Sequence, residues 1–135
     1  MDIKVIKPWG FEYTVFKKGT SVRVLHINKG EETSYHAHMK KDVLMILLSG
    51  RARMIRGGSQ TDYLEDLELI PMHVKQIPKT IFHKTQAIED SVVIEIESED
   101  NIHDLVRGED KYKRGQGYEV EEIKCVEDYI ENKEM

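Results

Sequence analysis

Short segments in which apolar, aromatic and β-branched residues alternate with polar residues recur along most of the chain, and turn residues separate them. About eight such segments at intervals of roughly ten residues are the spacing expected of an all-β sandwich or barrel. No long helical pattern interrupts the series, which argues against a parallel α/β fold. The expected strands are Phe11–Phe16, Ser21–Ile27, Val43–Leu48, Arg51–Ile55, Asp66–Ile70, Val74–Ile77, Ile81–Gln86 and Ser91–Glu97.

The longest aliphatic run, Val43–Leu48, contains no polar residue. It is far too short to span a membrane, and we interpret it as a strand that is buried on both faces. The N-terminal residues Met1 to Lys4 are charged and lack the apolar core of a signal peptide. We therefore expect a cytoplasmic protein with no membrane partner.

The pattern changes after Ser98, where charged residues and glycines become dense. Near the end, apolar residues recur every three to four positions, which fits either a short amphipathic helix or a loosely ordered tail. These residues are Val120, Ile123, Val126 and Ile130. We expect one domain over residues 1–135, with a barrel at about 5–98 and a C-terminal extension at about 99–135.

The composition narrows the class of protein. Hydrophobic residues make up 39% of the 135 residues and charged residues 33%, which is the balance of an ordinary soluble domain. The formal net charge of -5 argues against a nucleic-acid partner, which usually requires a basic face. The single cysteine, Cys125, rules out an intramolecular disulfide and the paired cysteines of a structural zinc site.

The strongest chemical signal is the histidine pair His36 and His38. On an extended strand, side chains two residues apart lie on one face, so both imidazoles would point the same way. His83, which follows a turn at Pro78, offers a third imidazole, and Asp42 offers a carboxylate oxygen. Such a set suits one divalent ion of zinc, manganese, iron, nickel or cobalt. The alternative is that the pair consists of solvated surface histidines.

The spacing of these residues resembles the two motifs of the cupin superfamily. Gly30, His36, His38 and Gly50 fall on the first motif, and Pro78 and His83 fall on the second. The resemblance implies a single-domain cupin, which is a double-stranded β-helix or jelly-roll barrel, with one metal ion held by the histidines.

The chain departs from both motifs. Asp42 and Val43 stand where the first motif places a glutamate, so Asp42 is the candidate for the fourth ligand. In the second motif, Met72 and Thr80 replace two glycines and Ala87 replaces an asparagine. If Asp42 is not a ligand, a water molecule would take its place.

Both ends of the barrel resemble the cupin domain of type II phosphomannose isomerases. Residues 7–12 (KPWGFE) are similar to its opening, and residues 104–114 (DLVRGEDKYKR) are similar to its closing motif, with Lys113 in place of a glycine. The resemblance covers roughly residues 5–115. It implies a homodimer and an aldose–ketose isomerase acting on a small sugar or sugar phosphate.

Four further residues are candidates for substrate binding or catalysis. Arg107 would bind a phosphate or stabilise developing negative charge, as the matching arginine of the isomerases is thought to do; the alternative is a salt bridge to an aspartate. Lys40 and Lys41 would attract an anionic substrate, or simply lie in solvent. Glu95 would act as the general base if its strand face points into the barrel, whereas we expect Glu95 and Glu97 on the solvated outer face.

Other functions remain open on the same scaffold. They are a non-catalytic sugar-binding module, an iron-dependent dioxygenase, and a structural cupin in which the metal only stiffens the barrel. Strand alternation also predicts that Tyr35 faces away from the metal. His26 is expected to be a packed histidine and not a ligand.

Overall fold

The computed structural model describes residues 3–99, 104–108 and 110–113, and over these residues the chain consists of strands and loops. All eight predicted segments are strands whose ends lie within two residues of the expected ones, so the all-β prediction is confirmed. Three strands were not predicted, namely β1, β4 and β11. The strands are β1 (Ile3–Lys7), β2 (Gly10–Lys18), β3 (Thr20–Ile27), β4 (His36–Ala37), β5 (Val43–Ser49), β6 (Ala52–Gly57), β7 (Glu65–Glu68), β8 (Val74–Ile77), β9 (Phe82–Ala87), β10 (Ser91–Glu97) and β11 (Val106–Arg107).

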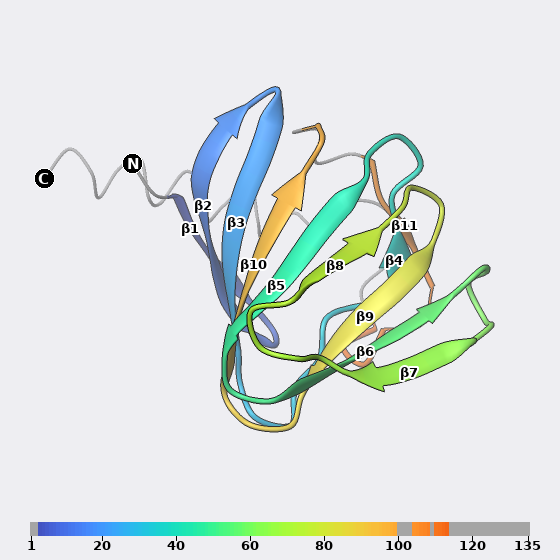
Figure 1. The fold of residues 1–135 in the computed structure, drawn as a ribbon. Helices are drawn as coiled ribbons and strands as arrows, with labels where there is room; N and C mark the ends of the chain where they lie inside the picture. The colour runs from blue at the N-terminus through green and yellow to red at the C-terminus, as the bar shows by residue number, and fades with distance from the viewer. Residues whose placement is uncertain (1–2, 100–103, 109, 114–135) are drawn as a thin grey trace, which may run out of the picture.

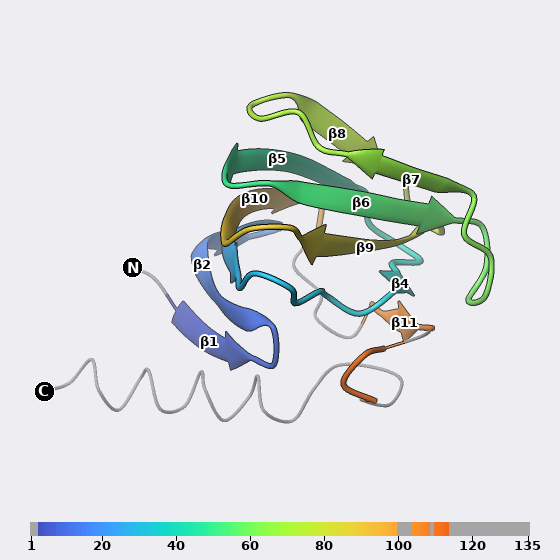
Figure 2. The same ribbon diagram turned by 90° about the horizontal axis from the view of Figure 1, so that it is seen from below.

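Two antiparallel sheets face each other across the interior of a barrel (Figure 1). The larger sheet has the order β1-β2-β3-β10-β5-β8, and the smaller has the order β11-β4-β9-β6-β7. Figure 2 shows β4 and β11 continuing the smaller sheet beyond β9. Residues 120–130, whose pattern fits either a short helix or a loosely ordered tail, lie outside the described residues. The described part of the chain contains no helix long and apolar enough to cross a membrane.

The core lies between the two sheets, where side chains from both inner faces interdigitate. The side chains of this core are at most 5% exposed, so solvent does not reach the part of the interior that they fill. Alternation along each strand produces this burial, because every second side chain points inward. The cluster consists of Trp9, Leu25, Ile27, Val43, Met45, Leu47, Ala52, Met54, Leu69, Ile77, Ala87 and Val93.

The prediction that Val43–Leu48 is buried on both faces is wrong. In β5 only alternate residues are buried, and Leu48 on the outer face is 40% exposed. The outer face of β5 is part of a row of apolar side chains across the larger sheet. Among the described residues, no second layer covers this row. The row follows the strand register as Tyr13, Val24, Ile94, Ile46 and Val74.

Candidate metal centre

The three histidines of the cupin motifs meet on neighbouring strands. His36 in β4 lies directly opposite His83 in β9, and His38 follows two residues later on the same side. Ring centroids are 4.6 Å apart for His36 and His83, and 5.1 Å apart for His36 and His38. One nitrogen from each ring lies within 4.8 Å of the other two, which is a spacing that one metal ion can bridge.

Each imidazole is held by a backbone carbonyl at its Nδ1 atom. Nδ1 donates to Ser34 O in His36 (2.7 Å), to Asp104 O in His38 (2.6 Å) and to Ile81 O in His83 (3.2 Å). A carbonyl oxygen only accepts, so Nδ1 carries the ring proton and Nε2 keeps its lone pair. The Nε2 atom of His83 is buried without a hydrogen-bond partner, as expected for a ligand atom aimed at a metal.

The electrostatics of the site keep the three rings neutral, which is the form that binds metal. Burial, followed by the neighbouring His38, lowers the pKa of His83 to about 3. Burial also holds the pKa of His36 well below its usual value, with further contributions from His83 and His38. The pKa of His38 is lowered by burial and then by the charge of Lys41.

The structure does not bring Asp42 to the histidines. Its side chain is exposed, and its carboxylate accepts a hydrogen bond from the Lys79 backbone amide (2.8 Å). The chain bends between β4 and β5, which resets the alternation, so that Lys41 and Val43 point inward and Asp42 points outward. The spacing in the sequence did not reveal this bend.

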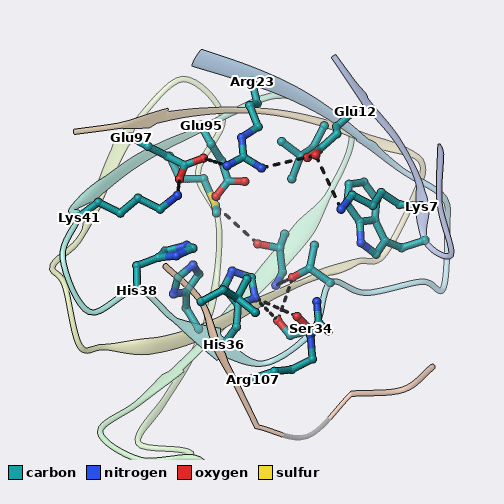
Figure 3. A pocket seen from close by; sticks show the side chains of 17 residues that line it. Lys7, Glu12, Arg23, Ser34, His36, His38, Lys41, Glu95, Glu97 and Arg107 are labelled. Atoms are coloured by element: carbon teal, nitrogen blue, oxygen red, sulfur yellow. Dashed lines mark hydrogen bonds and ion pairs between the residues drawn. The ribbon is translucent and has the colours of Figure 1, made fainter. Parts of the chain in front are cut away.

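The histidines line a cavity inside the barrel with a volume of about 70 Å³. That volume holds roughly two water molecules, because each occupies about 30 Å³ in the liquid. Figure 3 shows His36, His38 and Arg107 on one side of the cavity and a chain of charged residues on the other, most of them from the larger sheet. The charged residues are Lys7, Glu12, Arg23, Lys41, Glu95 and Glu97.

Glu95 and Glu97 lie inside the barrel, so the expectation of a solvated outer face is wrong. Glu97 is 2% exposed and forms ion pairs with Arg23 (2.5 Å) and Lys41. Burial, followed by the charge of Glu97, raises the pKa of Glu95 to about 7. Glu95 is therefore a carboxyl group in the cavity that gains and loses a proton near neutral pH.

The cationic candidates separate into two groups. Lys41 is 1% exposed and lines the cavity in an ion pair with Glu97, so it does not lie in solvent. Lys40 is exposed and does not line the cavity. Arg107 is 3% exposed and lines the cavity close to His36, whose pKa it helps to lower.

Sequence reasoning missed the ion pairs opposite the histidines. Arg23 bridges Glu12 (3.4 Å) and Glu97 (2.5 Å), and Lys7 lies 3.8 Å from Glu12. The available signal was strand alternation, because Arg23 lies two residues before inward-facing Leu25 in β3 and therefore shares its face. Two other expectations are confirmed: Tyr35 is fully buried in a cluster with Phe82, away from the cavity, and the ring of His26 stacks on Phe11.

No protein-family model matches the chain, and no curated protein matches its sequence. Solved structures do. KdgF from Halomonas sp. is 19% identical with a TM-score of 0.61, and the match covers 71% of this chain and 84% of that chain. An uncharacterized protein with a double-stranded beta-helix domain from Klebsiella pneumoniae is 17% identical with a TM-score of 0.61, covering 73% and 84%. The capsular polysaccharide assembling protein CapF from Staphylococcus aureus is 15% identical with a TM-score of 0.62, covering 87% and 32%.

These likenesses show the fold, which is the double-stranded β-helix of the cupins that the motifs predicted. The chain spans about a third of CapF and most of the other two proteins. The narrower resemblance to type II phosphomannose isomerases stays a prediction, as does the homodimer.

Proposed function

We propose that the protein is a metal-dependent cupin that acts on a small sugar or sugar phosphate as an aldose–ketose isomerase. The observation that carries the proposal is the cluster of His36, His38 and His83, whose ligand atoms share one cavity with Glu95. Three neutral imidazoles with an open fourth position suit a divalent ion that works as a Lewis acid. The capsular polysaccharide role named for CapF supports a saccharide as the ligand.

The metal, when bound, would polarise the carbonyl and the adjacent hydroxyl of the substrate. Glu95 then removes the proton from the carbon next to the carbonyl, which gives an enediolate. The same carboxyl delivers that proton to the former carbonyl carbon, and the proton of the adjacent hydroxyl passes to the former carbonyl oxygen, so an aldose becomes a ketose without gain or loss of atoms. A pKa of about 7 fits this role, because a base must accept the proton and then release it near working pH.

Glu95 is the carboxylate of the cavity that is best placed for proton transfer. Glu97 is engaged by Arg23 and Lys41, and Glu12 is engaged by Arg23 and Lys7. Against the effect of burial, the ion pairs of Glu97 lower its pKa and keep it ionised, so it is a poor proton carrier.

Arg107 is the residue that would bind negative charge on the substrate. Its guanidinium enters the cavity beside His36, where it would bind a phosphate or stabilise the enediolate. Lys41 contributes through Glu97, because the buried ion pair fixes the wall against which the substrate lies. Lys40 remains a candidate for attracting an anion from solvent.

The metal site is tested by elemental analysis of the purified protein and of two matched variants. We expect His36→Ala to lose the metal, and His73→Ala to keep it because His73 is exposed and remote from the cluster. Stoichiometric metal in the His36→Ala protein would refute the site.

The reaction is tested by NMR on a panel of hexoses and hexose phosphates with the metal-loaded protein. We expect isomer interconversion, and a loss of about 100- to 10,000-fold in Glu95→Gln, because a general base contributes that much. A ligand that raises the melting temperature but stays unchanged would point to a binding module instead. Oxygen uptake that requires Fe(II) would point to a dioxygenase.

A further inference from the structure

The segment comprising residues 104–108 and 110–113 runs antiparallel to the stretch that carries His36 and His38. Val106 lies opposite Ala37, and Arg107 lies opposite His36. The amide of Gly108 continues the same register by donating to Tyr35 O at 2.7 Å. The two-residue strand β11 is therefore only the centre of a longer contact. We call residues 104–108 and 110–113 the closing segment.

Asp104 binds the chain at His38 and at the two residues that follow it. Its carbonyl oxygen accepts the ring proton of His38 (2.6 Å), which leaves Nε2 for the metal. Its carboxylate accepts the backbone amides of Met39 and Lys40, each at 2.8 Å. Asp104 is 6% exposed, so these bonds form in a protected environment. One residue thus fixes both the orientation of a ligand ring and the turn that follows it.

Tyr112 and Lys111 hold the opposite end of the closing segment. The Tyr112 hydroxyl donates to the Glu31 carboxylate at 2.5 Å, and Lys111 contacts the same carboxylate at 3.0 Å. Lys111 also donates to Gly30 O (3.0 Å). The Tyr112 ring packs against the hydrophobic core, which anchors the segment to the barrel.

Strand β4 has few other contacts within its sheet. It lies between β11 and β9, and its pairing with β9 consists of the single pair His36 and His83. Without the closing segment, β4 would be an edge strand held by that pair and by the bond from the Thr80 amide to His38 O (2.6 Å), and His38 would lose the acceptor that sets its ring. An edge of this kind fluctuates more than a strand with neighbours on both sides.

We propose that the closing segment positions the metal ligands, with Asp104 as the positioning residue for His38. This inference rests on the proposed metal site and extends it to a segment 66 residues away in the sequence. Docking of the segment and binding of the metal then stabilise each other, because any coupling between two equilibria is reciprocal. Partners of this kind that orient a metal-bound histidine typically change metal affinity by about 10- to 100-fold.

The test measures the zinc affinity of Asp104→Ala, Asp104→Asn and the control Asp66→Asn. Asp66 is an exposed carboxylate in an ion pair with Arg53, far from the cluster. Asp104→Ala keeps the backbone carbonyl at position 104 but loses the carboxylate bonds that hold it beside His38. We therefore expect it to bind zinc about 10-fold more weakly, the low end of that range. Asp104→Asn should fall between it and the wild type, because the amide oxygen still accepts one backbone N–H. Asp66→Asn should bind as the wild type does.

Two further readouts separate positioning from a general loss of structure. The ¹⁵N shifts of the His38 ring should show the Nδ1-protonated form in the wild type. They should show a mixture of forms in Asp104→Ala, because the carbonyl at position 104 moves away from the ring once the carboxylate bonds to Met39 and Lys40 are lost. Zinc should also slow hydrogen exchange at the Gly108 amide, although Gly108 supplies no ligand. If Asp104→Ala fails to fold, Tyr112→Phe serves as the second variant, and it should weaken zinc binding in the same direction by less.

Unchanged zinc affinity in Asp104→Ala, or in Tyr112→Phe if the alanine variant does not fold, would overturn the inference while leaving the three-histidine site intact. Equal slowing of exchange in all strands, with none specific to Gly108, would also count against it. Failure of the wild-type protein to bind zinc or another divalent ion would instead refute the proposed function itself.

Discussion

The strongest prediction about the stability of the barrel concerns the replacement of Arg23. It bridges Glu12 and Glu97 across the wall of the cavity, with side-chain exposures of 17% for the arginine and 6% and 3% for the glutamates. Replacing Arg23 by methionine keeps much of the side-chain volume but removes the central cation. Both buried glutamates would then lose the cation that they share.

Removing one partner from a buried ion pair typically costs about 3–5 kcal/mol, because the remaining charge is left uncompensated. Lys41 still contacts Glu97, and Lys7 still lies 3.8 Å from Glu12. We therefore expect the low end of the range, about 3 kcal/mol, for Arg23→Met. That is a large share of the roughly 5–15 kcal/mol that stabilises an ordinary domain.

The assay is urea unfolding of the metal-free protein at neutral pH, so that metal affinity does not enter the result. Arg53→Met is the matched control, because its ion pair with Asp66 is exposed at 44% and 52%. An exposed pair is worth about 0–1 kcal/mol. Equal losses in the two variants would refute the argument that burial makes the Arg23 network important.

The pH dependence gives a second check on the same reasoning. Arg23 and Lys41 together hold the pKa of Glu97 below its usual value of 4.5, against the opposing effect of burial. A carboxylate with a lowered folded-state pKa contributes stability above its unfolded pKa and loses that contribution as pH falls through the folded value. The stability difference between the wild type and Arg23→Met should therefore shrink in acid. A difference that stays constant down to low pH would contradict this account.

Three other measurements follow from the structure. Asp42→Ala should retain stoichiometric metal, measured by elemental analysis, because its carboxylate is exposed and bonds to the Lys79 amide; loss of metal would restore Asp42 as a ligand. The folded-state pKa of Glu95 is raised to about 7, so ionisation of this carboxyl should lower the free energy of unfolding of the metal-free protein as pH rises from about 4.5 to 7. Glu95→Gln should abolish this pH dependence, measured by urea unfolding. An unchanged pH profile would show that Glu95 does not titrate there. Met54→Ala should cost about 2–5 kcal/mol in the same assay, because Met54 is 0% exposed in the core, and a loss under 1 kcal/mol would mean that the core collapses around the gap.

The sequence by itself determined the fold class and the secure part of the site. Alternation located eight of the strands, because side chains of a strand point to opposite faces in turn. The same rule placed His36 and His38 on one face and turned Tyr35 away from them, and the structure shows this arrangement. The second motif supplied His83, which β9 brings opposite His36.

Only the tertiary structure decided which face is inside and which distant groups meet. Alternation relates neighbours within one strand, but a bend resets it, as between His38 and Val43, where Lys41 turns inward and Asp42 outward. The inward placement of Glu95 depends on the sheet that covers its strand, and no local pattern records that choice. The bond from His38 to Asp104 joins residues 66 positions apart, so it exists only once β11 has paired with β4.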